Sequence, residues 1–167
     1  MSEKAIFVTK TVTQVSTTDL EGVGTLRWAG NKCYRWVKNA DDAAFIAGQA
    51  VFHKAGDAAN FYSNAYEALT AQLMFLAGVC VSAIAVSGYG WIQCLGHNAT
   101  VAVKNASGTT YAIGDYLIGA NGQTGFTVDA ATQALYKKNV QLLEAVATVT
   151  TTLIAYANKA CIINALD

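Results

Sequence analysis

Short runs of β-branched and aromatic residues, separated by glycine and asparagine but never by proline, constrain the fold of this chain more than any other feature. Such runs are typical of β-strands. Residues 25–28 and 33–38 are two of them, and they flank residues 29–32, Ala-Gly-Asn-Lys, which have turn chemistry. This pattern predicts a β-hairpin. Because proline is absent, glycine must make the turns, and strand edges need protection by twist, charge or a neighbouring subunit.

A second group of strand-like runs lies in the middle of the chain. Residues 79–83, 91–95 and 101–104 are rich in valine, isoleucine and small residues, and residues 87–88 and 96–98 interrupt them with glycine, serine and asparagine. The spacing predicts a meander of three short antiparallel strands.

Two connections carry mixed signals. In residues 57–72 apolar side chains recur at helical intervals, although Asn60, Ser63 and Asn64 are poor helix formers. Residues 129–144 present the same ambiguity, since an aspartate at their start is a good helix cap. Each segment is interpreted as a short helix or an ordered loop. The sequence therefore predicts a mainly β fold, a small β-barrel or β-sandwich, with one or two short helices in connections.

A faint internal repeat organises the chain. Residues 45–51, Phe-Ile-Ala-Gly-Gln-Ala-Val, correspond to residues 111–117, Tyr-Ala-Ile-Gly-Asp-Tyr-Leu, at a shift of 66 positions. A second correspondence, at a shift of 67 positions, pairs Tyr89 with Tyr156 and Cys94 with Cys161. Two related β-units that bury a shared core would suit a small barrel or sandwich. Chance similarity remains the alternative explanation.

The repeat defines the expected domain organisation. We interpret residues 24–167 as a single β-rich domain, built from possible repeat units at 45–96 and 111–165. Residues 1–23 precede the repeated body and are expected to form an extended N-terminal arm. Its strand-like run at residues 7–12 could add a strand to a neighbouring subunit.

Composition and charge exclude several classes of protein. The eleven basic and eleven acidic residues of the 167 are spread along the chain without longer runs of one charge, so nucleic acid is not an expected partner. The longest apolar stretch, residues 73–86, is shorter than the roughly 20 residues that a membrane helix needs, and the first residues lack the pattern of a secretory signal. Apolar types make up 53% of the chain and charged types 13%, which favours burial of surface against another chain.

Residues with catalytic or metal-binding potential are few and poorly spaced. The cysteines lie in apolar runs without a CxxC pair, which favours buried free thiols over disulfides. His53 and His97 have no carboxylate or cysteine at a metal-ligand or catalytic interval. The glycine-rich residues 88–90 and 119–122 are better explained as β-turns than as phosphate loops. We therefore expect no enzyme activity, no cofactor and no metal.

Aromatic residues on the predicted strands are the most informative side chains. They fill the core or lie at a subunit interface, where tryptophan and tyrosine are enriched. The set comprises Trp28, Tyr34, Trp36, Tyr89 and Trp91. Two arginines beside them could be solvated strand residues or interface anchors. Together with the apolar residues of the arm, the interface candidates are Phe7, Val8, Val12, Arg27, Trp28, Arg35 and Trp36.

With these residues in view, the chain resembles the capsid cement or head decoration proteins of tailed bacteriophages. The resemblance covers roughly residues 24–165. It is carried by four segments of small, β-branched and turn residues, and a short hairpin at 55–57 follows the first of them. They are Ala-Gly-Gln-Ala-Val at 47–51, Ala-Gly-Val-Cys-Val-Ser-Ala-Ile at 77–84, Gly-Tyr-Gly-Trp-Ile-Gln at 88–93 and Ile-Gly-Asp-Tyr-Leu at 113–117. The chain departs from the family in its longer connections at 57–72 and 129–144.

The resemblance implies a structural virion protein, made in the host cytoplasm, that binds the outer capsid surface and reinforces it against genome pressure. It implies the major capsid protein as partner, a homotrimer as the oligomer, and no catalytic residues. One alternative is a head-fibre or tail-fibre type module that faces a receptor, which copy number per particle would distinguish. The other is a small enzyme, disfavoured because the acidic residues show no convergent spacing.

Overall fold

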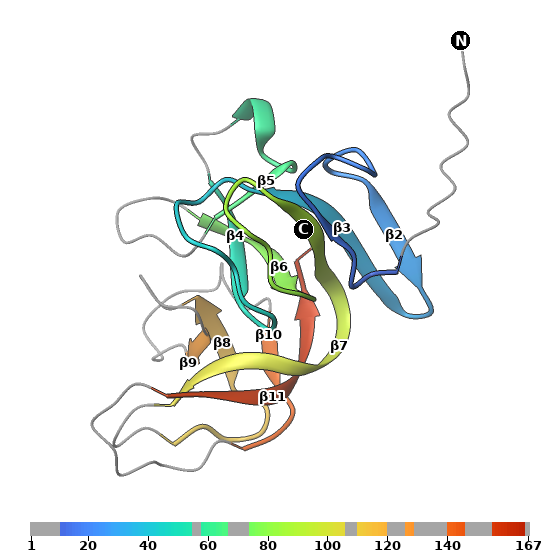
Figure 1. Cartoon of the computed structure of the whole chain (residues 1–167). Coiled ribbons are helices and arrows are strands. Elements are labelled where there is room, and N and C mark those ends of the chain that lie inside the picture. Colours follow the sequence, from blue (N-terminus) through green and yellow to red (C-terminus); the bar gives the residue numbers. More distant parts are fainter. Residues whose placement is uncertain are drawn as a thin grey trace.

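The computed structural model describes residues 11–54, 58–66, 74–105, 110–119, 126–128, 140–145 and 155–165. This part of the chain is mainly β, as predicted, and its strands form one largely antiparallel sheet. The strands are β1 (Val15–Ser16), β2 (Leu26–Ala29), β3 (Lys32–Asn39), β4 (Ala50–Lys54), β5 (Asn64–Ala65), β6 (Met74–Cys80), β7 (Tyr89–Asn105), β8 (Tyr116–Gly119), β9 (Phe126–Val128), β10 (Val140–Leu142) and β11 (Ala155–Asn164). Figure 1 shows their arrangement.

The hairpin predicted near the start of the domain is confirmed. β2 and β3 are antiparallel, and their register places Leu26 opposite Arg35 and Trp28 opposite Cys33. Gly30 makes the connecting turn with a φ of 61°, a conformation that glycine adopts without steric cost. β2 is the last strand on this side of the sheet and lies along the outer edge of β3 (Figure 1).

The predicted three-stranded meander is wrong in its second half. Residues 91–95 and 101–104 belong to one strand, β7, and the glycine at position 96 bends this strand instead of ending it. Gly96 has a φ of 96°, and a Cβ there would lie 2.7 Å from the carbonyl oxygen of Asn31. Glycine therefore allows a close backbone approach within a continuous strand, which sequence patterns do not distinguish from a turn.

The two ambiguous connections contain no α-helix in the part that the structure describes. In the first, Ala58–Asn60 form a single 3-10 turn and β5 follows. In the second, expected as a short helix or an ordered loop, residues 140–142 form the strand β10. Residues 129–139 lie outside the described residues.

Five strands, β3 to β7, pair in a first ring. β3 pairs with β7, β7 with β6, and β6 with β4, all antiparallel. The bridge between Phe52 and Tyr66 then connects β4 to the segment of β5, which pairs in parallel with β3. The order β3–β7–β6–β4–β5 thus returns to its starting strand, as the strands of a small barrel do.

A second ring, which includes β7 and β8 to β11, has the same pairing scheme. β7 pairs with β11, β11 with β10, and β10 with β8, all antiparallel. β8 pairs with β9, and a single parallel pairing between Val103 and Phe126 returns to β7. In chain order, β7 is thus the last strand of the first ring and the first strand of the second. Its 17 residues run from the region of β3 to that of β11 (Figure 1).

Three turns share one conformation and one set of hydrogen bonds. They span residues 45–49, 84–88 and 111–115, and each leads into a strand. Their fourth residues, Gly48, Ser87 and Gly114, have φ values of 81°, 59° and 92°. Each of these residues donates its N–H to the carbonyl oxygen at the end of another strand, in the order Cys80, Asn39 and Leu142. The N–H of that strand residue in turn donates to the carbonyl oxygen of the fifth residue of the same turn, which is Gln49, Gly88 or Asp115.

The first and third of these turns are the two segments that the sequence relates by a shift of 66. In both, the side chain after the left-handed glycine accepts a hydrogen bond from the turn backbone: Gln49 from Ile46 and Asp115 from Ala112, each at 2.8 Å. In the middle turn Gly88 occupies that position. The middle turn is therefore hard to recognise from sequence.

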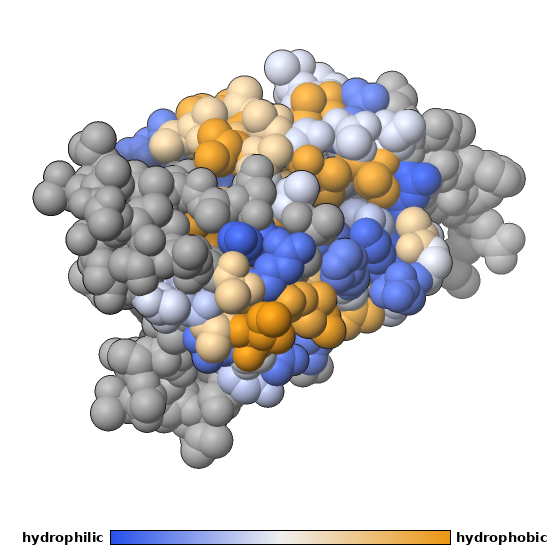
Figure 2. All heavy atoms as spheres, turned by 90° about the horizontal axis from the view of Figure 1, so that it is seen from below, coloured by the Kyte–Doolittle hydropathy of each residue, from blue (hydrophilic) through white to orange (hydrophobic). Residues whose placement is uncertain are grey.

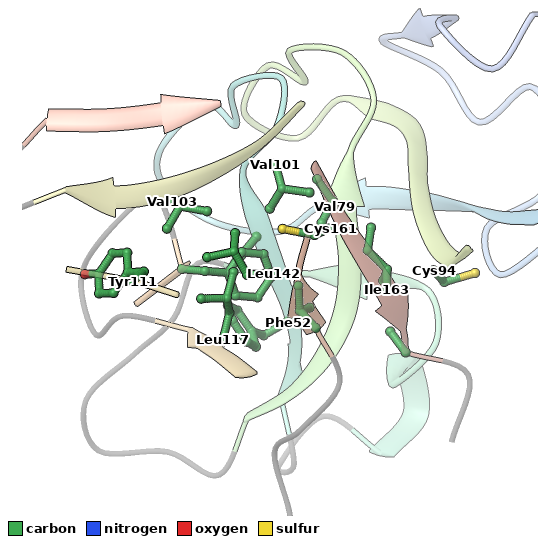
Figure 3. Close-up of a cluster of buried hydrophobic side chains, with 14 of the residues drawn as sticks. Phe52, Val79, Cys94, Val101, Val103, Tyr111, Leu117, Leu142, Cys161 and Ile163 are labelled. Carbon is green, nitrogen blue, oxygen red and sulfur yellow. The ribbon is translucent and has the colours of Figure 1, made fainter. Parts of the chain in front are cut away.

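The hydrophobic core continues through both rings. One cluster fills the first ring and includes Val37, Phe45, Val51 and Ile92. A larger cluster joins side chains of β3, β4 and β6 to those of the second ring. Figure 3 shows this cluster, with Phe52 and Val79 of the first unit near Leu117, Leu142 and Cys161 of the second.

The described half of the segment 1–23 lies against the domain. β1 pairs with β7 through Val15 and Ser16. Asp19 accepts a hydrogen bond from the indole N–H of Trp36 at 2.8 Å, and Asp19 also accepts the backbone N–H groups of Gly22 and Val23. The segment is thus connected to β7 through β1 and to β3 through the bond between Asp19 and Trp36. Residues 1–10 of the expected arm lie outside the described residues.

Candidate binding surface

The structure separates the interface candidates into buried and exposed residues. Trp36 is fully buried and Arg35 is 5% exposed, so both belong to the interior of the domain and not to its free surface. Trp28 is 59% exposed on β2. Arg27 is partly exposed on the opposite face of that strand, and Val12 packs on the cluster around Trp36. Phe7 and Val8 lie outside the described residues.

The remaining aromatic residues of the strands fill the core. Trp91 is buried and meets Trp36 edge-on, with ring centroids 5.3 Å apart, while Tyr34 and Tyr89 pack around them. The indole N–H of Trp91 has no hydrogen-bond partner among the described residues. Trp28 is thus the one member of the predicted aromatic set that lies on the surface.

All four cysteines are buried free thiols, which confirms the prediction from their apolar contexts. Burial raises the pKa of the Cys161 thiol to about 12 and that of Cys94 to about 12, where the neighbouring Cys33 contributes as well. Protonated, enclosed thiols are poor nucleophiles and poor metal ligands. They act here as small apolar side chains of the core.

Arg35 and His53 form a buried polar pair at one end of the first ring. Arg35 lies two residues before Val37 on β3, and His53 lies two residues after Val51 on β4. Residues two apart on a strand share a face, so both polar side chains lie on the inner face of that ring, next to its apolar core. The Arg35 Nη1 lies 2.7 Å from the His53 Nε2. The His53 Nδ1 lies 3.0 Å from the carbonyl oxygen of Asn64.

These two contacts define the state of the imidazole. The Asn64 carbonyl can only accept, so Nδ1 carries the proton and Nε2 accepts from Arg35. The pKa of His53 is lowered from 6.5 to about 4. Burial is the main cause and the positive charge of Arg35 adds to it, while the Asn64 hydrogen bond opposes the shift. The histidine is therefore neutral near pH 7.

Three aromatic rings cover this pair. Tyr62 stacks on the Arg35 guanidinium, whose Cζ is 4.8 Å from the ring centroid. Phe61 lies 5.1 Å from His53 and 5.6 Å from Phe75, centroid to centroid. Phe75 is also directly opposite His53 in the β4–β6 pairing. We call Arg35, His53, Phe61, Tyr62 and Phe75 the Arg35 cluster.

The Arg35 cluster is continuous with the exposed residues of β2. Leu26 is directly opposite Arg35 on β3, and Trp28 follows Leu26 on the same face of the strand. Leu26, Trp28, Tyr62 and Phe75 are each exposed, by 46%, 59%, 58% and 51%. A few large apolar side chains therefore surround a buried guanidinium.

Apolar surface also occurs on other faces of the molecule. On the face seen in Figure 2, hydrophobic residues form patches that hydrophilic residues separate. The second unit contributes Ile113, 68% exposed at the tip of its turn, and Ile162 on β11, 45% exposed. This distribution agrees with the low proportion of charged residues in the sequence.

Sequence reasoning identified Trp28 and Arg35 but missed the other residues of the Arg35 cluster and of the exposed apolar surface beside it. His53, Tyr62 and Phe75 meet Arg35 only through the pairing of β4 with β6 and of β5 with β3, and no short sequence interval connects them to Arg35. The signal that could have found them is a histidine and an arginine on inward-facing positions of two strands of one ring, which requires the pairing and register to be known.

The described residues hold no group of three or more histidine, cysteine, aspartate or glutamate side chains that could bind a metal ion. Among the same residues no helix is both long and apolar enough to cross a membrane. Comparison of the chain with known protein families, with curated proteins and with solved structures finds no significant match.

Proposed function

We propose that this chain is a structural, non-enzymatic protein that binds the outer surface of a bacteriophage capsid and stabilises the shell. The observation that carries the proposal is the exposed apolar surface of Leu26, Trp28, Tyr62 and Phe75 beside the edge strand β2. Tryptophan and tyrosine at such a surface are typical anchors of protein–protein contacts. The resemblance to cement proteins in residues 24–165 supports the capsid as partner.

The physical basis of the proposed function is repetition of a weak contact. Each copy buries a small apolar surface, and many copies on one lattice shift the shell towards its assembled form by mass action. Copies joined as a trimer bind with a higher effective concentration than single chains, which adds avidity without new contacts. The surface residues lie on or beside strands of a sheet whose two rings share β7.

The binding surface is tested with shells stripped of this protein. We expect the purified chain to rebind such shells and to raise the temperature at which they release their genome. The double variant Leu26→Ser, Trp28→Ser should bind about tenfold more weakly or worse, because anchor residues contribute roughly 2 kcal/mol or more. Ile113→Ser, which removes an apolar side chain that is 68% exposed on the second ring, is the control.

A different result would reject the proposal. If shells without the protein withstand heating as well as complete shells, while the particles fail to adsorb to host cells, the chain is a receptor-facing head-fibre or tail-fibre type module. Quantification of the chain in purified particles gives an independent answer, since a cement protein is present at lattice copy number. Light scattering of the free chain tests the trimer.

A further inference from the structure

Arg35 is a guanidinium that the described residues bury without an anionic partner. It is 5% exposed, and its contacts are the neutral His53 ring and the face of Tyr62. Its Nε atom is buried and has no hydrogen-bond partner among the described residues. Burying a charge is costly unless it is paired and fully hydrogen-bonded. The described contacts leave this charge unbalanced.

His53 cannot supply the missing anion. Its Nδ1–H donates to the Asn64 carbonyl, and its Nε2 lone pair already accepts from Arg35. A neutral ring bonded in this way satisfies one guanidinium donor and adds no negative charge. The remaining donors of Arg35 are therefore suited to a carboxylate, whose two oxygens match the planar guanidinium.

The position of Arg35 also determines what surrounds an incoming carboxylate. Tyr62, which covers the guanidinium, is 58% exposed and lies on the outside of the cluster. Leu26 lies opposite Arg35 on one side, and Phe75 lies opposite His53 on the other, both about half exposed. A group that reaches Arg35 thus passes between apolar side chains.

We infer that the Arg35 cluster and Leu26 form a docking site for an acidic segment of a partner protein. An aspartate or glutamate carboxylate of that segment binds the Arg35 guanidinium after Tyr62 swings aside, and its apolar neighbours cover Leu26 and Phe75. The inference rests on the proposed function, in which the capsid surface supplies this segment. It specifies the chemistry of the partner as an acid flanked by apolar residues.

A pair of short peptides tests the site on the full chain. The probe is acetylated, amidated Leu-Glu-Phe, and the control is the same peptide with glutamine in place of glutamate. Binding is followed by calorimetry and by the NMR signal of the Arg35 Nε–H. We expect the glutamate peptide to bind and to shift that signal, and the glutamine peptide to bind about tenfold more weakly or worse.

Variants separate the charge from the apolar contacts. Arg35→Gln should abolish the preference for the glutamate peptide, and Arg35→Lys should retain part of it, because an ammonium keeps the charge but not the planar fork. Leu26→Ser, at an exposed position, should weaken both peptides while the fold stays intact. Arg27→Gln, on the opposite face of β2, is the matched control and should leave both affinities unchanged. Melting curves verify that each variant is folded.

Several outcomes would overturn the inference. Equal binding of the two peptides, or no binding of either, rejects a carboxylate site. If Asp57→Asn or Glu67→Gln shifts the Arg35 Nε–H signal in the free chain, the guanidinium has an internal partner from residues outside the described part. If sodium acetate binds as tightly as the peptide, the site takes a free carboxylate and not a protein segment. Loss of shell binding in Leu26→Ser, Trp28→Ser without loss in Arg35→Gln would reject the inference while the proposed function stands.

Discussion

At the scale of single residues, the buried histidine makes stability depend on pH in a definite direction. The folded pKa of His53, about 4, lies below the unfolded value of 6.5. The unfolded chain therefore binds the proton more readily, and the stability present above about pH 6.5 is lost as the pH falls towards 4. The largest loss from this group is about 3 kcal/mol, since one pKa unit corresponds to roughly 1.4 kcal/mol.

The prediction concerns the difference between variants, because carboxylates titrate in the same range. The free energy of unfolding should fall between pH 7 and pH 4.5 by less in His53→Gln than in the parent chain. His97→Gln, at an exposed histidine, should follow the parent. Urea titrations at the two pH values measure this. A parent and a His53→Gln variant with the same pH dependence would show that the buried imidazole does not control it.

The equivalent glycines of the first and third turns give a matched test of steric contact. Both have positive φ, and a Cβ on Gly48 would overlap the Thr100 carbonyl oxygen, whereas a Cβ on Gly114 would find its nearest atom, Gln141 Nε2, at 4.0 Å. Gly114→Ala should therefore cost only the left-handed backbone strain, about 1 kcal/mol. Gly48→Ala should cost about 2–4 kcal/mol, because β7 must also move.

Chemical denaturation of the two variants decides between these effects. Equal losses of stability in Gly48→Ala and Gly114→Ala would mean that backbone strain alone matters and that the contact with Thr100 relaxes freely. Ser87, a natural non-glycine residue at the same turn position with a φ of 59°, shows that this backbone conformation can be tolerated.

At the scale of secondary-structure elements, β2 and β7 each carry a tryptophan, but the two have opposite roles. Trp91 on β7 is 1% exposed and packs on Trp36, whereas Trp28 on β2 is 59% exposed. Trp91→Ala should destabilise the fold by about 3–5 kcal/mol, since the surrounding core cannot refill the cavity. Trp28→Ala should change stability by no more than about 0.5 kcal/mol. Urea denaturation followed by circular dichroism compares them, and a stable Trp91→Ala variant would place that side chain outside the core.

The elements that sequence patterns predicted well are those whose signal is local. The hairpin of β2 and β3 follows from strand-forming residues on either side of Gly30, and the buried thiols follow from their apolar neighbours. The first and third turns also follow from sequence, because both keep a glycine at the left-handed position.

The elements that were missed depend on contacts between distant residues. Gly96 has the sequence signature of a turn, yet pairing with β11 on one side and the approach of Asn31 on the other keep it inside β7. The middle turn has Ser87 where its relatives have glycine. The site was predictable only for Trp28 and Arg35, since His53 and Tyr62 reach Arg35 through strand register.

At the scale of the whole molecule, the two rings should unfold together. β7 supplies hydrogen bonds to both β3 and β11, and one apolar cluster includes residues of both units. Melting of one ring would remove a wall of the other and expose that cluster, so a half-folded state is unfavourable. All three tryptophans precede residue 92, so their fluorescence reports the first unit.

This predicts that tryptophan fluorescence and far-ultraviolet circular dichroism give the same urea midpoint. The circular dichroism signal includes the strands of the second unit, and it would lag or lead if that unit unfolded separately. Two distinct midpoints would contradict the shared-strand architecture as a cooperative unit.

The double use of β7 also sets a rule for how a chain of this design can grow. The first ring uses five strands, but the second needs only four new ones, because β7 belongs to both rings. β7 has 17 residues and serves two rings, while β11 has 10 and serves one. A longer β11 followed by four more strands would therefore begin a third ring, so length can be added in modules of about 66 residues, the distance between equivalent turns. In such a protein no interior ring could be removed whole, because each would share one strand with the next ring.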